Sequence, residues 1–185
     1  ETHRLPAGVD PGLDATRFYD PIRGTFAAGA QAAIVEVDPE TGVLAIRRYV
    51  CVEDTGRVIN PRIVEGQVQG AIAQGIGGAV AEQLVYDEAG QLLTSGFMDY
   101  ALPTAVTVPP IELEHIEEPA ANLIGVRGVG EGGTLGPAAV LANAVADALA
   151  PFGVEPDELP LTPARLWAAC AGARPSSGDD PQRIS

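Results

Sequence analysis

Apolar residues recur at every fourth position through one long stretch of the chain, which is the spacing of an amphipathic helix. This ridge consists of Val64, Val68, Ile72, Ile76, Val80 and Leu84. The Asn60–Pro61 pair suits a helix start, because proline is tolerated at the first helical position, and a turn at Asp87–Gly90 suits its end. The pattern therefore predicts a helix over about residues 62–84.

Two runs rich in β-branched residues lie on either side of Asp38–Gly42, whose proline and glycine suit a hairpin turn. They predict strands near residues 30–38 and 43–52. A third strand is predicted at about residues 111–118, where alternating polar and apolar residues follow the Pro109–Pro110 pair. Proline lacks the N–H that a strand interior needs, so this pair confines the strand to its start or to an edge.

Two helices are predicted after these strands. Pro137 suits the first turn of one helix, and Pro151 and Gly153 lie just past its end. The other is short, with Thr162 as its N-cap and Pro163 at its first position. The fold class predicted from these elements is α+β, with a mixed sheet and helices.

The chain of 185 residues is expected to form one domain with extended ends. Residues 1–25 are interpreted as an extended leading segment, residues 26–172 as the domain, and residues 173–185 as a disordered tail. The first residue is glutamate, so we expect a chain that was processed or cut from something longer. Its core looks too small to close all its own faces.

Composition excludes some partners and indicates a compartment. The formal net charge of −14 disfavours nucleic acid and anionic membranes, which bind clustered Lys and Arg. No apolar run is expected to reach the ~20 residues that cross a bilayer. Cys51 and Cys170 stand alone without a CxxC spacing, which favours two reduced thiols in a cytoplasmic protein.

The side of the long helix away from its ridge is unusual. Gln67 and Gln74 fall within roughly 20° of each other on it, with Gly70 and Gly78 beside them. No residue between Glu65 and Glu82 carries a charge, although a solvated face usually does. Three interpretations stay open: a solvated face, a close helix or subunit contact, and a hydrogen-bonding surface for a polar ligand. Two amides would suit a heterocycle or an oxo group.

A second unusual segment is the glycine-rich IGVRGVGEGGTLGP at residues 124–137. It lacks the spacings of a P-loop, a Rossmann turn and a nucleophile elbow. A nucleotide-binding module would need a basic residue near the phosphates, and only Arg127 is available. His3 and His115 are the two histidines, and His115 in a strand is interpreted as structural rather than catalytic.

Glu131 stands at the centre of this glycine loop. One interpretation is an exposed carboxylate near a helix N-terminus, where the helix dipole favours negative charge. The other is a partly desolvated general base, because flanking glycines let other atoms approach the backbone closely.

Two motifs together carry a family resemblance. DTGRVINPRIVEGQVQGAIAQG, followed by GVRGVGEGGTLGPAAVLANAVADAL, resembles the C-terminal part of the molybdopterin-binding large subunit of the xanthine dehydrogenase, aldehyde oxidase and carbon monoxide dehydrogenase family. The resemblance covers about residues 26–170, in the family's order and at its spacing. It implies the C-terminal portion of a molybdopterin-binding domain.

The resemblance also implies roles for particular residues. Glu131 matches the general base beside molybdenum, and Gln67 matches the glutamine that reaches the molybdenum oxo ligand or the pterin. Gln74, on the same helix face, is a weaker candidate. No direct protein ligand to molybdenum is expected. The backbone expected to lie against the cofactor is that of Gly128, Val129 and Gly130.

The implied reaction is the hydroxylation of an aldehyde or an N-heteroaromatic compound with water as the oxygen source. Glu131 would accept a proton at the molybdenum, and electrons would pass to iron–sulfur clusters and FAD on partner chains or domains. The cofactor is expected to be molybdopterin in its cytosine dinucleotide form. The residues after Glu131 resemble the aldehyde and heteroaromatic branch more than the carbon monoxide dehydrogenases.

Large subunits of this family are several times longer than this chain. We therefore expect a subunit of a split enzyme or a C-terminal piece of a longer one. The expected partners are the remainder of the large subunit, the iron–sulfur and FAD subunits, and a small-molecule substrate. The alternative is a non-catalytic scaffold or assembly subunit, which would have no reason to keep Glu131 and Gln67.

Overall fold

The computed structural model describes residues 5–6, 12, 14–20 and 23–173. The tail predicted at 173–185 therefore lies outside the described residues from residue 174 onward, as does part of the leading segment. The elements are, in chain order, β1 (Ala28–Val37), β2 (Leu44–Asp54), α1 (Pro61–Val80), β3 (Ile111–Ile116), η2 (Gly132–Thr134), α2 (Pro137–Leu149), η3 (Ala150–Phe152) and α3 (Pro163–Ala171), where η marks a short 3₁₀ helix.

The three strands form one mixed sheet in the order β1-β2-β3. β1 and β2 are an antiparallel hairpin whose register runs from Ala28 opposite Asp54 to Val37 opposite Leu44. β3 lies parallel to β2 on its other side. The predicted mixed sheet with helices is thus confirmed, as is the predicted N-cap of α3, where Thr162 Oγ1 accepts a hydrogen bond from Arg165 N.

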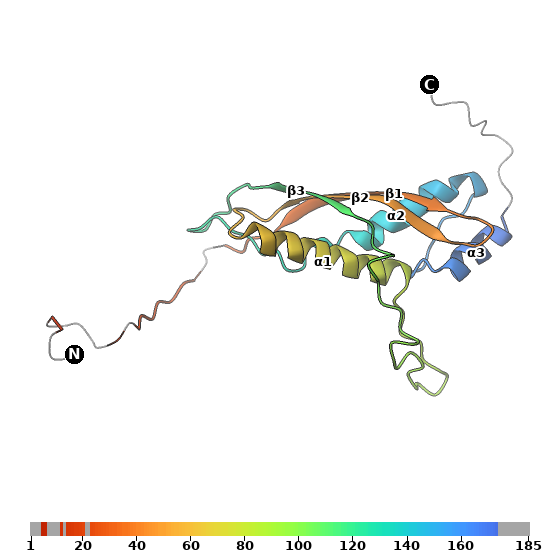
Figure 1. Cartoon of the computed structure of the whole chain (residues 1–185), viewed down its shortest axis with the longest axis horizontal. Coiled ribbons are helices and arrows are strands. Elements are labelled where there is room, and N and C mark those ends of the chain that lie inside the picture. The colour runs from red at the N-terminus through yellow and green to blue at the C-terminus, as the bar shows by residue number, and fades with distance from the viewer. Residues whose placement is uncertain (1–4, 7–11, 13, 21–22, 174–185) are drawn as a thin grey trace, which may run out of the picture.

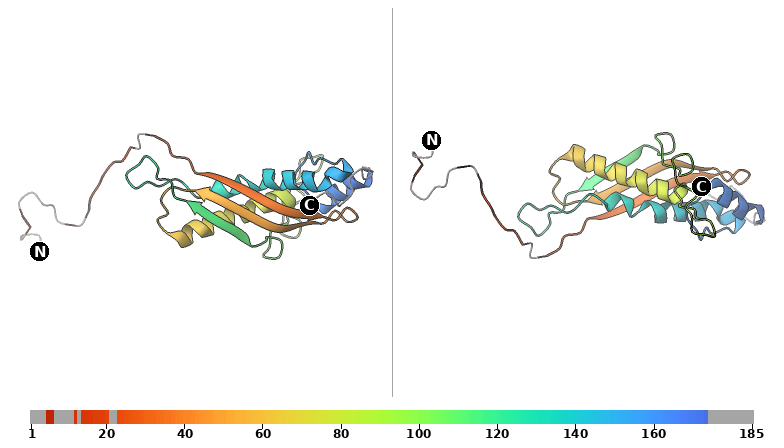
Figure 2. Two further views of the ribbon diagram at one scale, coloured as in Figure 1. Left: turned by 90° about the horizontal axis from the view of Figure 1, so that it is seen from above. Right: turned by 90° about the horizontal axis from the view of Figure 1, so that it is seen from below.

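Helices α1 and α2 lie together on one face of the sheet, with α2 packed on β1 and α1 nearer β3 (Figures 1 and 2). The core lies between this layer and the strands, and α3 closes one end. Its fully buried large side chains include Tyr49, Val68, Ile72, Ile76, Leu141, Val145, Leu149, Leu161 and Leu166. On the outer face of the sheet, Arg48 donates two hydrogen bonds of 2.6 Å to the Glu112 carboxylate.

Helix α1 ends earlier than its apolar ridge predicts. The backbone N–H groups of Ala81 and Glu82 both donate to the Gly77 carbonyl, at 2.9 and 2.8 Å, and the chain then leaves the helix. Leu84, the last member of the ridge, is consequently off the helix and 57% exposed. The prediction of a helix continuing to residue 84 was therefore wrong by about one turn.

Residues 81–110 form an arm, much of which stands away from the layered core (Figure 1), while Pro103 lies against α1 at Gly77 and Val108 packs on the core. Within this segment the backbone forms one isolated bridge, between Tyr86 and Leu92, and no longer helix or strand. The arm exposes large apolar side chains, namely Leu84, Val85, Tyr86, Leu93, Phe97, Met98, Leu102 and Val106. An apolar surface of this kind is typical of a segment that packs against another part of a protein.

One apolar stretch is longer than the sequence led us to expect. The helical stretch Gly132–Phe152 has a mean hydropathy of 1.4 and is long enough to cross a membrane by length and composition alone. Helix α2 itself has 13 residues, or about 20 Å, which is short of the ~30 Å hydrocarbon core. It buries Leu141, Val145 and Leu149 in the core, so its apolar character is that of a core helix.

Candidate functional site

The stem of the glycine loop is held by the residues that follow β2. Arg127 N donates to the Thr55 carbonyl at 2.9 Å, and Arg57 N donates to the Gly125 carbonyl at 2.8 Å. A partly buried ion pair of 3.2 Å joins Arg127 Nη1 to Asp54 Oδ2. The end of β2 thus sets where the loop begins.

The other end of the loop is held by α1 and β1. Thr134 Oγ1 donates to the Ala71 carbonyl at 2.9 Å, and Gln31 Nε2 donates to the Gly133 carbonyl at 3.2 Å. Gln31 is itself fixed, because its Oε1 accepts a hydrogen bond of 2.5 Å from Tyr49 Oη. Residues 128–132 lie between the two anchored ends, and in the described part of the chain no hydrogen bond ties them to another element.

Three glycines of the loop lie in close contact with other parts of this chain. A Cβ on Gly133 would lie 2.6 Å from the Val68 carbonyl oxygen and 3.0 Å from the Ala71 Cβ. A Cβ on Gly136 would overlap the Gln31 amide, and one on Gly132 would overlap the Glu53 carboxyl. At these three positions the absence of a side chain lets the loop backbone pack closely against α1 and the sheet.

Two other glycines have no such role within the chain. A Cβ on Gly128 would meet nothing within 4 Å, and one on Gly130 would meet only Gln67 Nε2, at 3.8 Å. Neither glycine has a backbone conformation that disfavours other residues, because both φ angles lie outside the left-handed region. The described chain therefore gives no reason for a glycine at either position, and both border open space.

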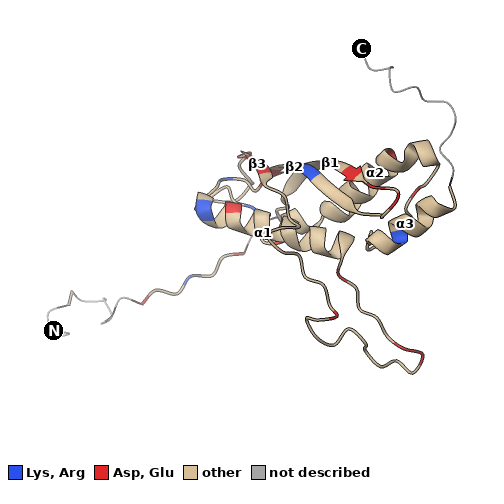
Figure 3. Cartoon of the chain, turned by 45° about the vertical axis from the view of Figure 1, so that its right-hand side comes forward, with Lys and Arg blue, Asp and Glu red and all other residues tan. Residues whose placement is uncertain are grey.

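The polar side of α1 is also open, and Gln67 on this side lies beside Gly130. Gln67 and Gln74 are exposed, and a Cβ on Gly70 or Gly78 would meet nothing within 4 Å. Charge on α1 is confined to its N-terminal end (Figure 3). The contact with α2 is made elsewhere on the helix, at Gly75. The close-contact interpretation of this side therefore does not hold within this chain.

Glu131 is exposed at the start of η2, with a φ of −118° and a ψ of −4°. Its carbonyl accepts a hydrogen bond of 3.1 Å from Thr134 N, while its carboxylate has no hydrogen bond or ion pair among the described residues. Val129 is half-buried and packs against the core. The loop thus presents the Glu131 carboxylate freely, but this chain alone does not shield it from water.

Sequence reasoning missed Glu53, which lies beneath the loop. It is 3% exposed, and neither carboxyl oxygen has a partner in the described structure. Burial raises the pKa of Glu53, while the nearby His115 lowers it. The alternation along β2 was the available signal, because Glu53 falls on the same inward side as Tyr49 and Cys51. His115 is half-buried on β3 and pairs with Glu53 across the sheet, and His3 lies outside the described residues.

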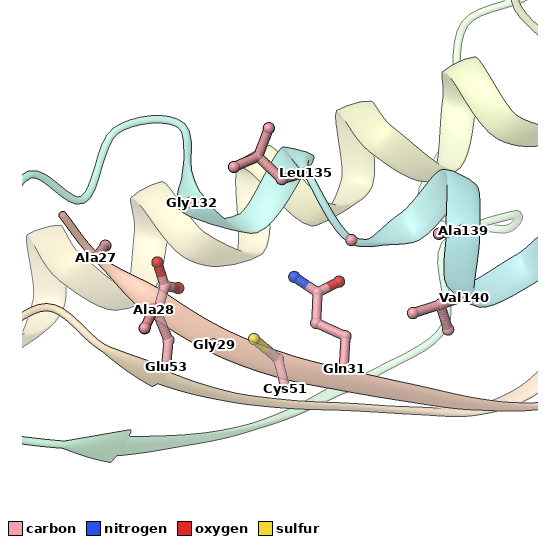
Figure 4. Close-up of a pocket in the computed structure, with 11 residues that line it drawn as sticks. Ala27, Ala28, Gly29, Gln31, Cys51, Glu53, Gly132, Leu135, Ala139 and Val140 are labelled. Carbon is pink, nitrogen blue, oxygen red and sulfur yellow. The ribbon is translucent and has the colours of Figure 1, made fainter.

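Glu53 borders a cavity of about 310 Å³ between β1, β2 and the start of α2. Figure 4 shows Glu53, Cys51 and Gln31 pointing into this space beneath η2. Cys51 and Cys170 are free, as predicted. Both are buried, and burial raises the pKa of the Cys51 thiol to about 11. No group of three or more His, Cys, Asp or Glu residues forms a metal-binding cluster in the described part of the chain.

The chain belongs to the family of molybdopterin cofactor-binding domains, and its residues 3–109 match the sequence model of that family. The match ends before the glycine loop, but similarity to individual proteins continues through it. The chain is 46% identical over 173 residues to the nicotine 6-hydroxylase large subunit of Paenarthrobacter nicotinovorans. That alignment covers 93% of this chain and 21% of the relative, so the chain spans about a fifth of its length.

Solved structures show the same relationship. A Cu,Mo-CO dehydrogenase matches with a TM-score of 0.85 and 37% identity, over 92% of this chain and 22% of the other. Quinoline 2-oxidoreductase from Pseudomonas putida 86 matches with a TM-score of 0.84 and 41% identity, with the same coverage. The predicted resemblance to molybdenum-binding large subunits is confirmed.

Proposed function

We propose that this chain is the C-terminal part of the large subunit of a molybdenum hydroxylase, in which it supplies one wall of the molybdopterin site and the general base Glu131. The observation that carries this proposal is the open space at Gly128 and Gly130, beside Gln67. The packing of the chain itself does not require glycine at these positions. A flat ligand lying against the loop backbone would require glycine there.

The residues bordering this space fit a molybdopterin. The open loop offers the backbone of Gly128, Val129 and Gly130, and the Gln67 amide adds two donors and an acceptor close to Gly130. Gln74 lies two helical turns further along the same face, about 10 Å away, and would meet a different part of the ligand. We keep the cytosine dinucleotide form of the cofactor as part of the proposal.

The bound cofactor would supply the two-electron oxidation, with water as the oxygen source. The chain's own part is to move one proton. The carboxylate of Glu131 would accept it from the oxygen that attacks the substrate, a contribution of typically 10²–10⁴-fold. Because Glu131 is exposed here, the remainder of the subunit would have to exclude water from it.

The proposed substrate is an aldehyde or an N-heteroaromatic compound. Two relatives support the second class, because the proteins named for nicotine and quinoline are 46% and 41% identical to this chain. Both compounds contain a pyridine ring. The carbon monoxide dehydrogenase structure is 37% identical.

The proposed partners are the remainder of the large subunit and subunits that carry iron–sulfur clusters and FAD, in the cytoplasm. The exposed apolar side chains of the arm, residues 81–110, support the proposal of further partners, because these side chains would be buried in a larger assembly. A non-catalytic scaffold is less well supported. The Glu131 carboxylate makes no hydrogen bond or ion pair among the described residues, so a scaffold would not need it.

The test is Glu131→Gln in the assembled enzyme, with turnover measured per bound molybdenum. We expect turnover to fall by at least about a hundredfold, with unchanged molybdenum content, because the amide cannot accept the proton. Glu40→Gln is the matched control, since Glu40 is an exposed glutamate in the β1–β2 turn. Unchanged turnover of Glu131→Gln would exclude the general-base role.

A further inference from the structure

Glu53 is a buried acidic side chain that the proposed chemistry does not use. It comes from the end of β2 and points, with Cys51, toward the underside of the loop at Gly132 (Figure 4). Neither of its carboxyl oxygens has a hydrogen-bond partner in the described structure, although the residue is 3% exposed. Burying a carboxyl group without a partner is costly, so its place beneath the loop calls for an explanation.

The carboxyl end of Glu53 fills the space where a side chain of Gly132 would lie. A Cβ on Gly132 would overlap Glu53 Oε1 and would lie 3.1 Å from Glu53 Cδ. Gly132 directly follows Glu131 in the chain. Glu53 therefore supports the backbone immediately next to the proposed general base.

The loop has few other supports at this point. The nearest hydrogen bonds from the loop to the strands are at Arg127 and Gly133, on either side of the segment. Between them, Val129 packs on the core, and Glu53 contacts Gly132. Gly130 and Glu131 are thus held between one apolar contact and one carboxyl contact.

The contact of Glu53 with Gly132 depends on the length of its side chain, because neither carboxyl oxygen makes a hydrogen bond in the described structure. Its neighbours across the sheet are Gly29 on β1 and His115 on β3. The two ring nitrogens of His115 are also buried without a hydrogen-bond partner among the described residues. Glutamine has the same length as glutamate and would keep the contact with Gly132, whereas alanine would remove it.

We propose that Glu53 is a positioning residue, which holds Gly132 and thereby sets the position of the Glu131 carboxylate against the cofactor. This inference rests on the proposed function. It makes a second, structural claim that can be tested separately, namely that the loop backbone between Arg127 and Gly133 loosens when the Glu53 side chain is removed.

The first test uses four variants of the assembled enzyme: Glu53→Gln, Glu53→Ala, Gly132→Ala, and the last two combined. We expect Glu53→Ala to lower kcat by about tenfold to a hundredfold, with KM and molybdenum content unchanged, because a small displacement of a reacting group is enough for this loss. Glu53→Gln should stay near wild type. Gly132→Ala should also lose turnover, because its methyl group displaces the carboxyl.

The combined variant is the sharpest part of this test. The methyl group that Gly132→Ala introduces would lie 3.1 Å from the place of Glu53 Cδ, so it can fill the space that the shortened side chain vacates. We therefore expect the combined variant to be more active than either single variant, a non-additivity that reports direct contact. Additive losses would overturn the proposal, as would a fully active Glu53→Ala.

The second test does not depend on turnover. Trypsin cleaves after arginine, and Arg127 lies where the weakly supported segment begins. Cleavage after Arg127 should be about tenfold faster in Glu53→Ala and near the wild-type rate in Glu53→Gln and in the combined variant, because cleavage follows local opening. An unchanged rate in Glu53→Ala would refute the loosening. If Glu131→Gln kept full activity, the proposed function would fail while this test still judged the role of Glu53.

Discussion

Alanine substitutions at Gly133 and Gly128 should have opposite consequences, although the two glycines share one loop. At Gly133 the new methyl group would lie 2.6 Å from the Val68 carbonyl oxygen, which belongs to the backbone of α1 and cannot turn away. Overpacking of this kind costs about 1–3 kcal/mol. At Gly128 the methyl group would meet nothing within 4 Å, and the backbone conformation is open to alanine. There the reduced entropy of the unfolded chain should stabilise the fold by about 0.4–1 kcal/mol.

Urea unfolding followed by circular dichroism measures the first half of this prediction, as the change in the free energy of unfolding. The second half is measured in the assembled enzyme. Gly128→Ala should lower molybdenum content, or turnover per molybdenum, by at least about tenfold, because its methyl group would stand between the loop backbone and the cofactor. A destabilised Gly128→Ala protein would show that Gly128 serves the fold. A stable protein with full molybdenum content and full turnover would show that nothing lies against it.

Three further predictions test the structure away from the open loop. Burial raises the pKa of Glu53 above its ordinary value of 4.5, so its contribution to stability is full below that value and is lost as pH rises through the folded-state pKa. Glu53→Gln should therefore gain stability relative to wild type between pH 4 and pH 7 in urea unfolding, and a pH-independent difference would contradict this. The Cys51 thiol, with a pKa of about 11, should react with iodoacetamide at pH 7.5 far more slowly in the folded protein than in urea, and rapid labelling of the folded protein would refute its burial. Gly42→Ala should destabilise the chain by at least about 2 kcal/mol in urea unfolding, because Gly42 combines a φ of +71° with close packing against Pro163. Gly90 has a φ of +81° but lies in open space, so Gly90→Ala should cost only about 1–2 kcal/mol. Equal losses of stability in the two variants would contradict the packing of Gly42 against Pro163.

Much of the secondary structure follows from local patterns. The hairpin around Asp38–Gly42, the helix starts at Pro61 and Pro137, and the N-cap at Thr162 appear where proline, glycine and hydroxyl chemistry predicts them. The end of α1 does not follow from a local pattern. The four-residue apolar spacing continues to Leu84, and no glycine or proline follows Val80 at once to mark the helix end.

The candidate site was only partly accessible from the sequence. The Gln67 face and the glycine loop each stand out locally, but only the fold places Gln67 beside Gly130, which lies far along the chain. Which loop glycines serve the fold and which face open space depends on that tertiary packing. Glu53 could be placed on the inner side of β2 by alternation. Its lack of a hydrogen-bond partner depends on the elements that surround it, so the sequence pattern could not reveal it.

The central claim is that this chain forms part of a molybdopterin site, and metal analysis tests it most directly. The chain would be tagged, co-expressed with the remainder of its large subunit in a host that makes molybdopterin, and purified, and molybdenum and pterin would then be measured per chain. We predict about one molybdenum and one pterin per chain. An assembled complex that contains neither would contradict the account.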